Sequence, residues 1–344
     1  MIDHSIIIRR LSASVRVSGD PRALEWVTLK GQTYFEFVEP QEASRTWTIV
    51  AGLEYAPDLQ WETHTRGAGV ERVSYRFNRE QQIVVIDAMP GAWRNLWTLR
   101  LVRDLLRWQL FHAGAVFVHG GLFEHEGRGF LLIGPSRAGK TTLLVRLMQI
   151  SGNALIGEDD LTLVPTPEGQ VRALGWPGSI RIRRDGLNLL PEIADLSSFS
   201  HPANEIDAIR DPKIGRLRIF HEELAKATGC TVLPETRLSA ILAVGWGAEA
   251  EATQLDRTGI AAELMAFWDI LPERRPGTRP KSGRRDLQYW RDFCFNPFLL
   301  ESFGLPATTP PMKTPADFVD ALAGYRIRHA GRCGPIQRLL NHVS

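Results

Sequence analysis

The sequence predicts a mixed α/β protein of two domains, a smaller β-rich domain over residues 1–91 and a larger α/β domain over residues 92–344. Three observations predict this organisation. Short apolar runs separated by turn residues, which are typical of strands, fill the first 90 residues. An amphipathic helix pattern follows them. Beyond it, an apolar run, a glycine-rich loop, a helix pattern and a second apolar run form a βαβ unit, which predicts a mainly parallel sheet covered by helices.

Four runs predict the strands of the N-terminal domain: Ser5–Ile8, Thr33–Val38, Thr46–Val50 and Ile83–Ile86. This segment holds no arrangement of catalytic side chains. We therefore expect a scaffold, an oligomerisation domain or a domain that presents substrate.

The helix pattern runs from about Ala92 to Leu110, with leucine and valine at helical spacing. Its arginines fall mostly outside the apolar stripe: Arg94, Arg100, Arg103 and Arg107. A basic stripe is usually a solvated helix face, so we expect these side chains on the surface, with contact to an acidic partner as the alternative.

Composition narrows the class of protein. The chain is 44% hydrophobic and 23% charged, and its 41 basic and 39 acidic residues leave a net charge of +2, which argues against a general nucleic-acid binder. The three cysteines, Cys230, Cys294 and Cys333, form no metal-binding or disulfide spacing, which fits a reducing cytosol. No signal-peptide pattern and no apolar stretch near the ~20 residues of a membrane span is found, so we expect a cytoplasmic protein without a membrane partner.

A phosphate-binding motif, G-x-x-x-x-G-K-[ST], follows the apolar run Phe130–Ile133. Its residues, with the threonine after them, are the predicted nucleotide-binding set: Gly134, Pro135, Ser136, Arg137, Ala138, Gly139, Lys140, Thr141 and Thr142. The glycines let the backbone approach an anion closely, so that successive N–H groups hold phosphate oxygens at the start of a helix. We expect Lys140 to reach the β- and γ-phosphates and the Thr141 hydroxyl to ligate Mg²⁺. The chain lacks the guanine-reading Asn-Lys-x-Asp motif, which favours ATP.

Chemically active residues lie on both sides of this loop. His119-Gly120-Gly121 precedes it, and Glu158-Asp159-Asp160 follows the next apolar run. In phosphoryl transfer one carboxylate orients or deprotonates the attacking hydroxyl and another holds Mg²⁺. Because adjacent residues of a continuous strand point to opposite faces, we expect the strand to end just after Gly157, where both acids can serve one site. A solvated acidic turn is the alternative.

The order His119, phosphate loop fifteen residues later, helix, Asp159-Asp160 resembles HPr kinase/phosphorylase and the wider group of HPr-kinase-related proteins. The resemblance covers residues 109–185 well, is looser to about residue 330 and does not extend into residues 1–90. It implies a P-loop, HPr-kinase-like C-terminal domain. It also implies roles for single residues: His119 near the phosphates, Lys140 and Thr141 as loop lysine and metal-binding hydroxyl, Asp159 as general base, Asp160 as its acidic neighbour near the metal, and Lys213 as a basic position.

Two departures mark a divergent member of that family. The family's Gly-Glu-Pro, whose glutamate assists the metal, is matched here by Gly175-Trp176-Pro177, and the Arg-Gly-rich signature of the reverse phosphorolysis is not recognisable. These losses argue against HPr itself as substrate and against a reverse reaction more than against kinase activity. The run Arg181–Arg184 fits either a phosphate or acidic-peptide contact or a solvated strand end.

The sequence thus predicts an ATP- and Mg²⁺-dependent kinase that phosphorylates a hydroxyl, which the resemblance suggests is a Ser or Thr of a protein or peptide. Two alternatives stay open, a nucleotide-binding regulatory module without phosphotransfer and a kinase of a small molecule such as a sugar or antibiotic. A homo-oligomer is compatible with the resemblance.

Overall fold

The computed structural model describes residues 4–39, 46–60, 62–66, 73–78, 80–183, 186–187, 190, 193, 199–202, 204, 216–247, 251–267, 316–329, 336–337 and 340. The mixed α/β architecture predicted from the sequence is confirmed. Two compact units divide the chain between Ala113 and Gly114. The helix that begins at Ala92 therefore belongs to the first unit, whereas the predicted boundary placed it in the second. No helix in the described residues has the length and apolar character needed to cross a membrane.

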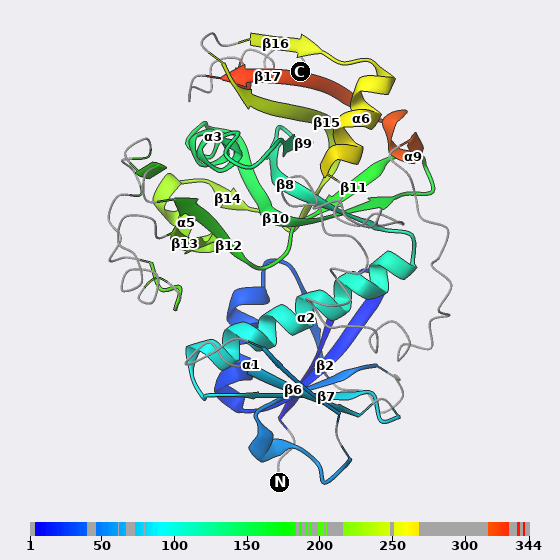
Figure 1. The fold of residues 1–344 in the computed structure, drawn as a ribbon, viewed down its shortest axis with the longest axis vertical. Helices are drawn as coiled ribbons and strands as arrows, with labels where there is room; N and C mark the ends of the chain where they lie inside the picture. Colours follow the sequence, from blue (N-terminus) through cyan, green and yellow to red (C-terminus); the bar gives the residue numbers. More distant parts are fainter. Residues whose placement is uncertain are drawn as a thin grey trace, which may run out of the picture. The chain divides into compact units, whose positions relative to one another are not determined.

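The first unit is a seven-stranded mixed sheet in the order β3-β1-β2-β4-β7-β6-β5, with two helices that pack on each other and on the sheet (Figure 1). Its elements are β1 (Ser5–Arg10), β2 (Ala13–Gly19), α1 (Pro21–Gly31), β3 (Glu36–Val38), β4 (Thr48–Ala51), η1 (Leu53–Tyr55), β5 (Glu62–Arg66), β6 (Val73–Asn78), β7 (Ile83–Ala88) and α2 (Ala92–His112). The sequence predicts β1, β3, β4, β7 and α2 but not α1. Strand β2 also escapes a search for apolar runs, because its residues are buried only at alternate positions.

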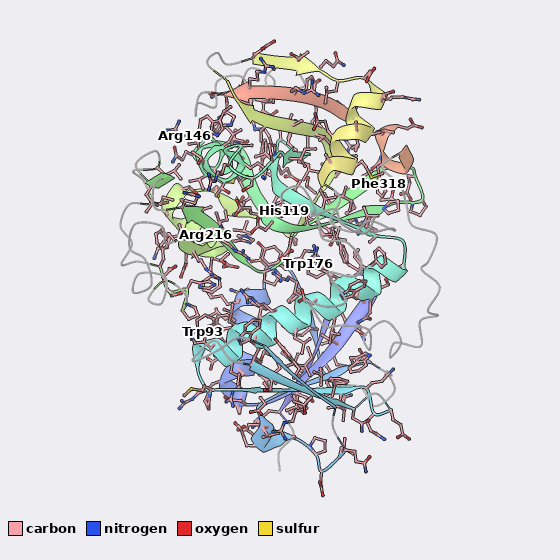
Figure 2. The ribbon with its side chains drawn as sticks, viewed as in Figure 1. Trp93, His119, Arg146, Trp176, Arg216 and Phe318 are labelled. Carbon is pink, nitrogen blue, oxygen red and sulfur yellow. The ribbon has the colours of Figure 1, made fainter. Side chains whose placement is uncertain are left out.

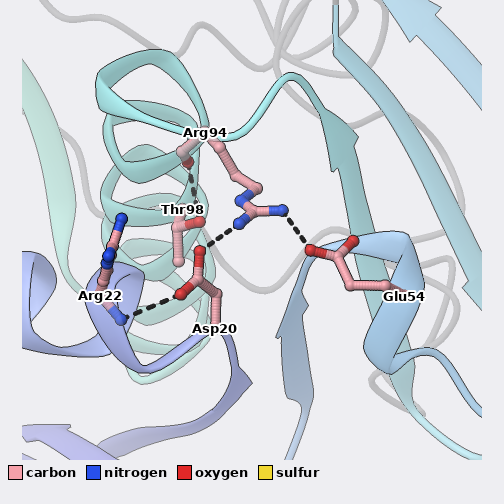
Figure 3. A network of polar contacts seen from close by, with 5 residues as sticks. All are labelled: Asp20, Arg22, Glu54, Arg94 and Thr98. Atoms are coloured by element: carbon pink, nitrogen blue, oxygen red, sulfur yellow. Dashed lines mark hydrogen bonds and ion pairs between the residues drawn. The ribbon is translucent and has the colours of Figure 1, made fainter.

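Arg94 shows that the arginines of α2 do not form a solvated stripe. Its side chain is 3% exposed and binds two acids from other parts of the unit (Figure 3). One guanidinium nitrogen donates to Glu54 Oε1 at 2.7 Å, and the other donates to Asp20, the residue that also caps α1 by accepting from the Arg22 N–H at 3.0 Å. Arg107 is buried as well. The expectation of an exposed basic face is therefore wrong for these two residues, and for Arg94 the reason is that acids from outside the helix hold its guanidinium.

The second unit is built on an eight-stranded sheet in the order β11-β10-β8-β9-β15-β17-β16, with β14 added beside β10, and a two-stranded sheet of β12 and β13 (Figure 1). Its strands are β8 (Val116–His125), β9 (Arg128–Ile133), β10 (Asn153–Pro165), β11 (Val171–Leu174), β12 (Ser179–Arg183), β13 (Arg216–Phe220), β14 (Thr231–Val232), β15 (Glu235–Trp246), β16 (Glu251–Gln254) and β17 (Ala323–His329). Its helices are α3 (Lys140–Leu147), α5 (His221–Thr228), α6 (Arg257–Phe267) and α9 (Ala316–Val319).

The prediction of a mainly parallel sheet is wrong for the described strands. Only β9–β15, β15–β17 and β10–β14 are parallel, and the other pairings of this sheet are antiparallel. The reason lies in the turn between β8 and β9, where Glu126 and Gly127 both have positive φ, of 50° and 77°. Such a two-residue turn makes a hairpin, so β8 enters antiparallel between β9 and β10. The predicted β9–α3–β10 unit exists, but β8 lies between β9 and β10 in the sheet.

Helices cover both faces of this sheet, so the run Phe130–Ile133 of its central strand β9 is apolar at every position (Figure 1). Phe130 and Leu132 of β9 pack in a cluster with α3, β12 and β13. Leu131 and Ile133 point the other way, into a cluster with α6 and α9. This alternation anchors β9 on both sides and thereby holds the loop that leaves its end.

Candidate nucleotide-binding site

The phosphate loop, Gly134–Thr141, connects the end of β9 to α3, as the sequence predicts. Both motif glycines are required by close neighbours. A Cβ on Gly134 would lie 2.5 Å from the Val244 carbonyl oxygen, and Gly139 has φ of 85°. Arg137 also has positive φ, of 68°, which is unusual for a residue with a side chain. Such backbone is typical of concavities whose N–H groups bind an anion.

Two aromatic side chains from the neighbouring strands hold the loop from outside. His329, the last residue of β17, is fully buried and contacts the Ala138 carbonyl oxygen through Nε2 at 2.9 Å. Because a carbonyl only accepts, Nε2 carries the proton, and burial lowers the pKa of His329 and keeps the ring neutral. Trp246, the last residue of β15, donates its indole N–H to the Arg137 carbonyl oxygen at 2.6 Å. Neither residue belongs to a local motif, so neither could be predicted from the sequence as part of the site.

Gly139→Ala is expected to disable the loop. The added Cβ would lie 2.6 Å from His329 Cε1 and 3.1 Å from Trp246 Cζ2, in backbone that disfavours a side chain. Gly127→Ala is the matched control, because Gly127 has a similar φ of 77° but no atom within 4 Å of the added Cβ. We expect about 1 kcal/mol of destabilisation in the control, from backbone strain, and a further 1–3 kcal/mol in Gly139→Ala, with loss of nucleotide binding. Equal unfolding free energies in denaturant titrations of the two variants would contradict the steric argument.

Lys140 begins α3 and lies across the loop. Its ammonium donates to the Gly134 carbonyl oxygen at 2.8 Å and to the Pro135 carbonyl oxygen at 3.2 Å. Burial lowers the pKa of Lys140, while the nearby carboxyl groups of Glu158 and Asp159 act in the opposite direction. The ammonium is thus held at the phosphate loop in the position from which a phosphate oxygen can replace the carbonyls.

The acidic residues meet the loop in the middle of β10 and not at its end. Strand β10 continues to Pro165, so the expectation that it ends after Gly157 is wrong. Gly120 of β8 lies opposite Asp159, and the adjacent Gly121 lies opposite Leu132, near the end of β9. The phosphate loop and the acidic residues therefore lie at the same position along the strand direction. A bulge between Leu155 and Gly157 precedes the acids, and Asp159 has a positive φ of 65°, so its backbone departs from regular strand geometry.

Glu158 is the acid that touches the first turn of α3. The Thr141 hydroxyl donates to Glu158 Oε1, and the Arg181 backbone N–H donates to Oε2 at 3.2 Å. The pKa of Glu158 is raised to about 8, first by burial and then by the neighbouring Asp159 carboxylate, while the two hydrogen bonds and the Arg181 charge act in the opposite direction. Glu158 directly precedes the predicted acidic pair but is not itself a predicted site residue. Its contact with Thr141 makes it a candidate metal ligand beside the predicted Asp160.

Asp159 lies between a histidine and an arginine. His119 Nε2 is 3.6 Å from Asp159 Oδ1, and Arg181 Nε is 3.7 Å from Asp159 Oδ2. His119, which belongs to β8, is labelled in Figure 2. All three side chains are between about one quarter and two fifths exposed, so a reactant can reach the carboxylate from solvent. The structure thus places His119 and Arg181 on the two oxygens of Asp159, and Lys140 is close enough to interact electrostatically with the same carboxylate.

Other predicted residues have different positions. Asp160 lies opposite His119 in the β8–β10 register. Trp176, at the position of the family's glutamate, is buried, and its indole N–H donates to Thr162 Oγ1 at 2.9 Å (Figure 2). Trp176 is thus a core residue and cannot replace the metal-assisting carboxylate of a glutamate. Lys213 and Arg184 lie outside the described residues.

The donor set at the start of α3 fits Mg²⁺. Within the described part of the chain, no group of three or more His, Cys, Asp or Glu residues could hold a metal ion. A phosphate-loop site needs no such group, because Mg²⁺ there takes one or two protein oxygens and otherwise phosphate oxygens and water. The Thr141 hydroxyl and the Glu158 carboxyl group, which contact each other, would be those protein oxygens.

A cavity of about 510 Å³ lies away from these residues, at the other end of α3. It is lined by residues 148–154 and 228–231, with Glu124 and Leu233. Its one thiol, Cys230, has a pKa raised by burial, which disfavours the reactive thiolate. The chemistry described above does not involve this cavity.

No protein-family model and no curated protein matches this sequence. Among solved structures, the Hpr(Ser) kinase/phosphatase from Coxiella burnetii is a remote structural neighbour. It is 13% identical in sequence, with a TM-score of 0.28, and the match covers 66% of this chain and 95% of that chain. A likeness at this level carries no argument about activity, so the function rests on the residues of the site.

Proposed function

We propose that this chain is an ATP- and Mg²⁺-dependent phosphotransferase that transfers the γ-phosphoryl group to a hydroxyl, with an HPr-kinase-like P-loop arrangement in its second unit. The observation that carries the proposal is the convergence of a phosphate loop, a Thr141–Glu158 oxygen pair and the partly exposed Asp159 at the start of one helix. A structural acidic cluster would not need a phosphate loop at the same level of the sheet.

In the proposed reaction, different residues bind the triphosphate, stabilise its charge and accept the proton. Loop N–H groups and the α3 N-terminus bind the triphosphate, and Lys140 offsets charge on the transferring group. Asp159 takes the proton of the acceptor hydroxyl as its oxygen bonds to the γ-phosphorus and the bond to the β–γ bridging oxygen breaks. Mg²⁺, held by Thr141 and Glu158, with Asp160 as the further predicted ligand, would neutralise charge on the β- and γ-phosphate oxygens.

For the acceptor we propose a Ser or Thr hydroxyl of a protein or peptide in the cytosol. The family resemblance suggests this class. The exposure of Asp159 also supports it, because its side chain is 29% exposed. A kinase for a small molecule would instead be expected to enclose the reacting carboxylate.

Phosphotransfer from γ-labelled ATP to candidate proteins and peptides tests the proposal. Asp159→Asn is expected to lower label transfer by about 10²–10⁴-fold, because the amide cannot take the proton. Asp256→Asn, the same change at an exposed residue before α6, is the control and should leave the rate unchanged. Equal label transfer by wild type and Asp159→Asn would remove the assigned role of Asp159.

One observation favours a nucleotide-binding regulatory module as second candidate. Arg181 lies within ion-pair distance of Asp159 and could keep the carboxylate occupied. Tight ATP binding without label transfer to any acceptor, together with a partner that binds only the nucleotide complex, would support this function and exclude the first.

A further inference from the structure

The ends of three parallel strands define the surroundings of the phosphate loop. Strands β9, β15 and β17 are neighbours and run in the same direction, so their carboxyl ends lie at one edge of the sheet. The loop leaves β9 there, and Trp246 and His329 are the last residues of β15 and β17. In the register of the latter two strands, Trp246 lies opposite His329.

Trp246 is held in place yet remains half exposed. Its indole N–H is bonded to the Arg137 carbonyl oxygen, and its ring centroid lies 4.6 Å from that of His329 at an interplanar angle of 36°. These contacts fix one edge of the indole and occupy the side toward His329. The residue nevertheless stays 50% exposed, although tryptophan is a large side chain that usually buries most of its surface.

The order of the strands tells which end of a nucleotide reaches Trp246. The acids that would face the transferred phosphoryl group lie on β10, and β8 separates β10 from β9. Trp246 lies on the opposite side of β9, at the end of β15. A triphosphate in the loop with its γ-phosphate toward Asp159 therefore directs its nucleoside end toward β15 and β17.

We propose that the exposed indole of Trp246 is the stacking surface for the purine base of the nucleoside triphosphate held by the phosphate loop. This inference rests on the proposed function, because it needs a triphosphate in the loop. Stacking on an aromatic side chain requires no hydrogen-bond readout, so it provides affinity for ATP and GTP alike. The bond from the indole to Arg137 ties the base site directly to the loop that binds the phosphates.

Calorimetric titration of the full chain with ATP, CTP and inorganic tripolyphosphate, each with Mg²⁺, tests the proposal. The wild type is expected to bind ATP more tightly than CTP, and CTP more tightly than tripolyphosphate, since purines offer the larger stacking surface. Trp246→Ala is expected to weaken ATP binding roughly 5- to 100-fold, from the usual strength of base–aromatic stacking, and to leave tripolyphosphate binding within about twofold. Trp246→Phe keeps an aromatic face without the indole N–H and should retain most of the preference for ATP.

The other outcomes separate the inference from the proposed function. Equal losses for ATP and tripolyphosphate in Trp246→Ala would show that Trp246 only supports the loop, and the stacking proposal would be overturned. The same follows if wild type binds tripolyphosphate as tightly as ATP, or if Trp246→Phe loses as much of the ATP preference as Trp246→Ala. Each of these results leaves triphosphate binding intact. If the wild type binds none of the three ligands, the proposed function fails as well.

Discussion

Lys140→Met is expected to lower phosphotransfer from ATP by at least about 10²–10³-fold, the usual effect of removing one group that stabilises transition-state charge. Methionine keeps the length of the side chain but lacks the ammonium that now bonds the carbonyl oxygens of Gly134 and Pro135. No other lysine occurs in the loop, and Arg137, the other basic residue of the loop, is exposed. The measurement is the rate of label transfer at saturating ATP, together with ATP affinity by calorimetry.

The same variant should fold as well as the wild type. Burial lowers the pKa of Lys140, so the folded protein holds this charge at some cost, and an apolar replacement relieves it. An unchanged denaturation midpoint would therefore separate loss of chemistry from loss of structure. Lys226→Met, the same change at an exposed position of α5, is the matched control and should alter neither quantity. If Lys140→Met kept more than about a tenth of the wild-type rate, Lys140 would not hold the role given to it.

Glu158→Gln is expected to stabilise the ligand-free protein while it abolishes Mg²⁺-dependent phosphotransfer. In the folded state the pKa of Glu158 is raised to about 8 from an ordinary value of 4.5. Between these two values the folded protein keeps a proton that the unfolded chain has released. The free energy of unfolding therefore falls as pH rises through this window, and the whole penalty is present above pH 8.

Glutamine reproduces the protonated acid at every pH. Its amide can donate to the Thr141 oxygen while its carbonyl accepts from the Arg181 N–H, so both present contacts keep a partner. The stability difference between Glu158→Gln and wild type should be below about 1 kcal/mol at pH 5 and on the order of 4 kcal/mol at pH 8. Denaturant titration at the two pH values, without nucleotide or Mg²⁺, measures it. Glu251→Gln, at an exposed position of β16, is the control and should show no such difference.

A stability difference that stays constant with pH would contradict the raised pKa of Glu158. Activity provides the second readout, because glutamine offers no negative charge to a cation. Full Mg²⁺-dependent activity in Glu158→Gln would assign the metal to other residues, with Asp160 as the first candidate. A variant that is more stable and inactive fits a site where an unfavourably buried carboxyl group is retained for function.

The local parts of the site could be predicted from the amino-acid sequence. The glycine spacing around Lys140 is a backbone requirement of the loop, and the structure shows the neighbours that impose it at Gly134 and Gly139. The apolar run of β9 and the period of α2 are also local patterns, and they predicted those elements correctly. The roles of His119, Asp159 and Asp160 came from a resemblance, and they stay predictions.

Only the tertiary structure decided which side chains share the site. The hairpin at Glu126-Gly127 inserts β8 between β9 and β10, which sets Asp159 level with the loop, and the positive φ of Asp159 departs from the alternation that adjacent strand residues would otherwise follow. Glu158 reaches Thr141, and Trp246 and His329 reach the loop carbonyls, across large sequence separations. Such contacts depend on strand order and register, which pairing across the whole sheet determines and no local pattern encodes. The sequence therefore determined the phosphate loop itself, and the fold determined the groups that surround it.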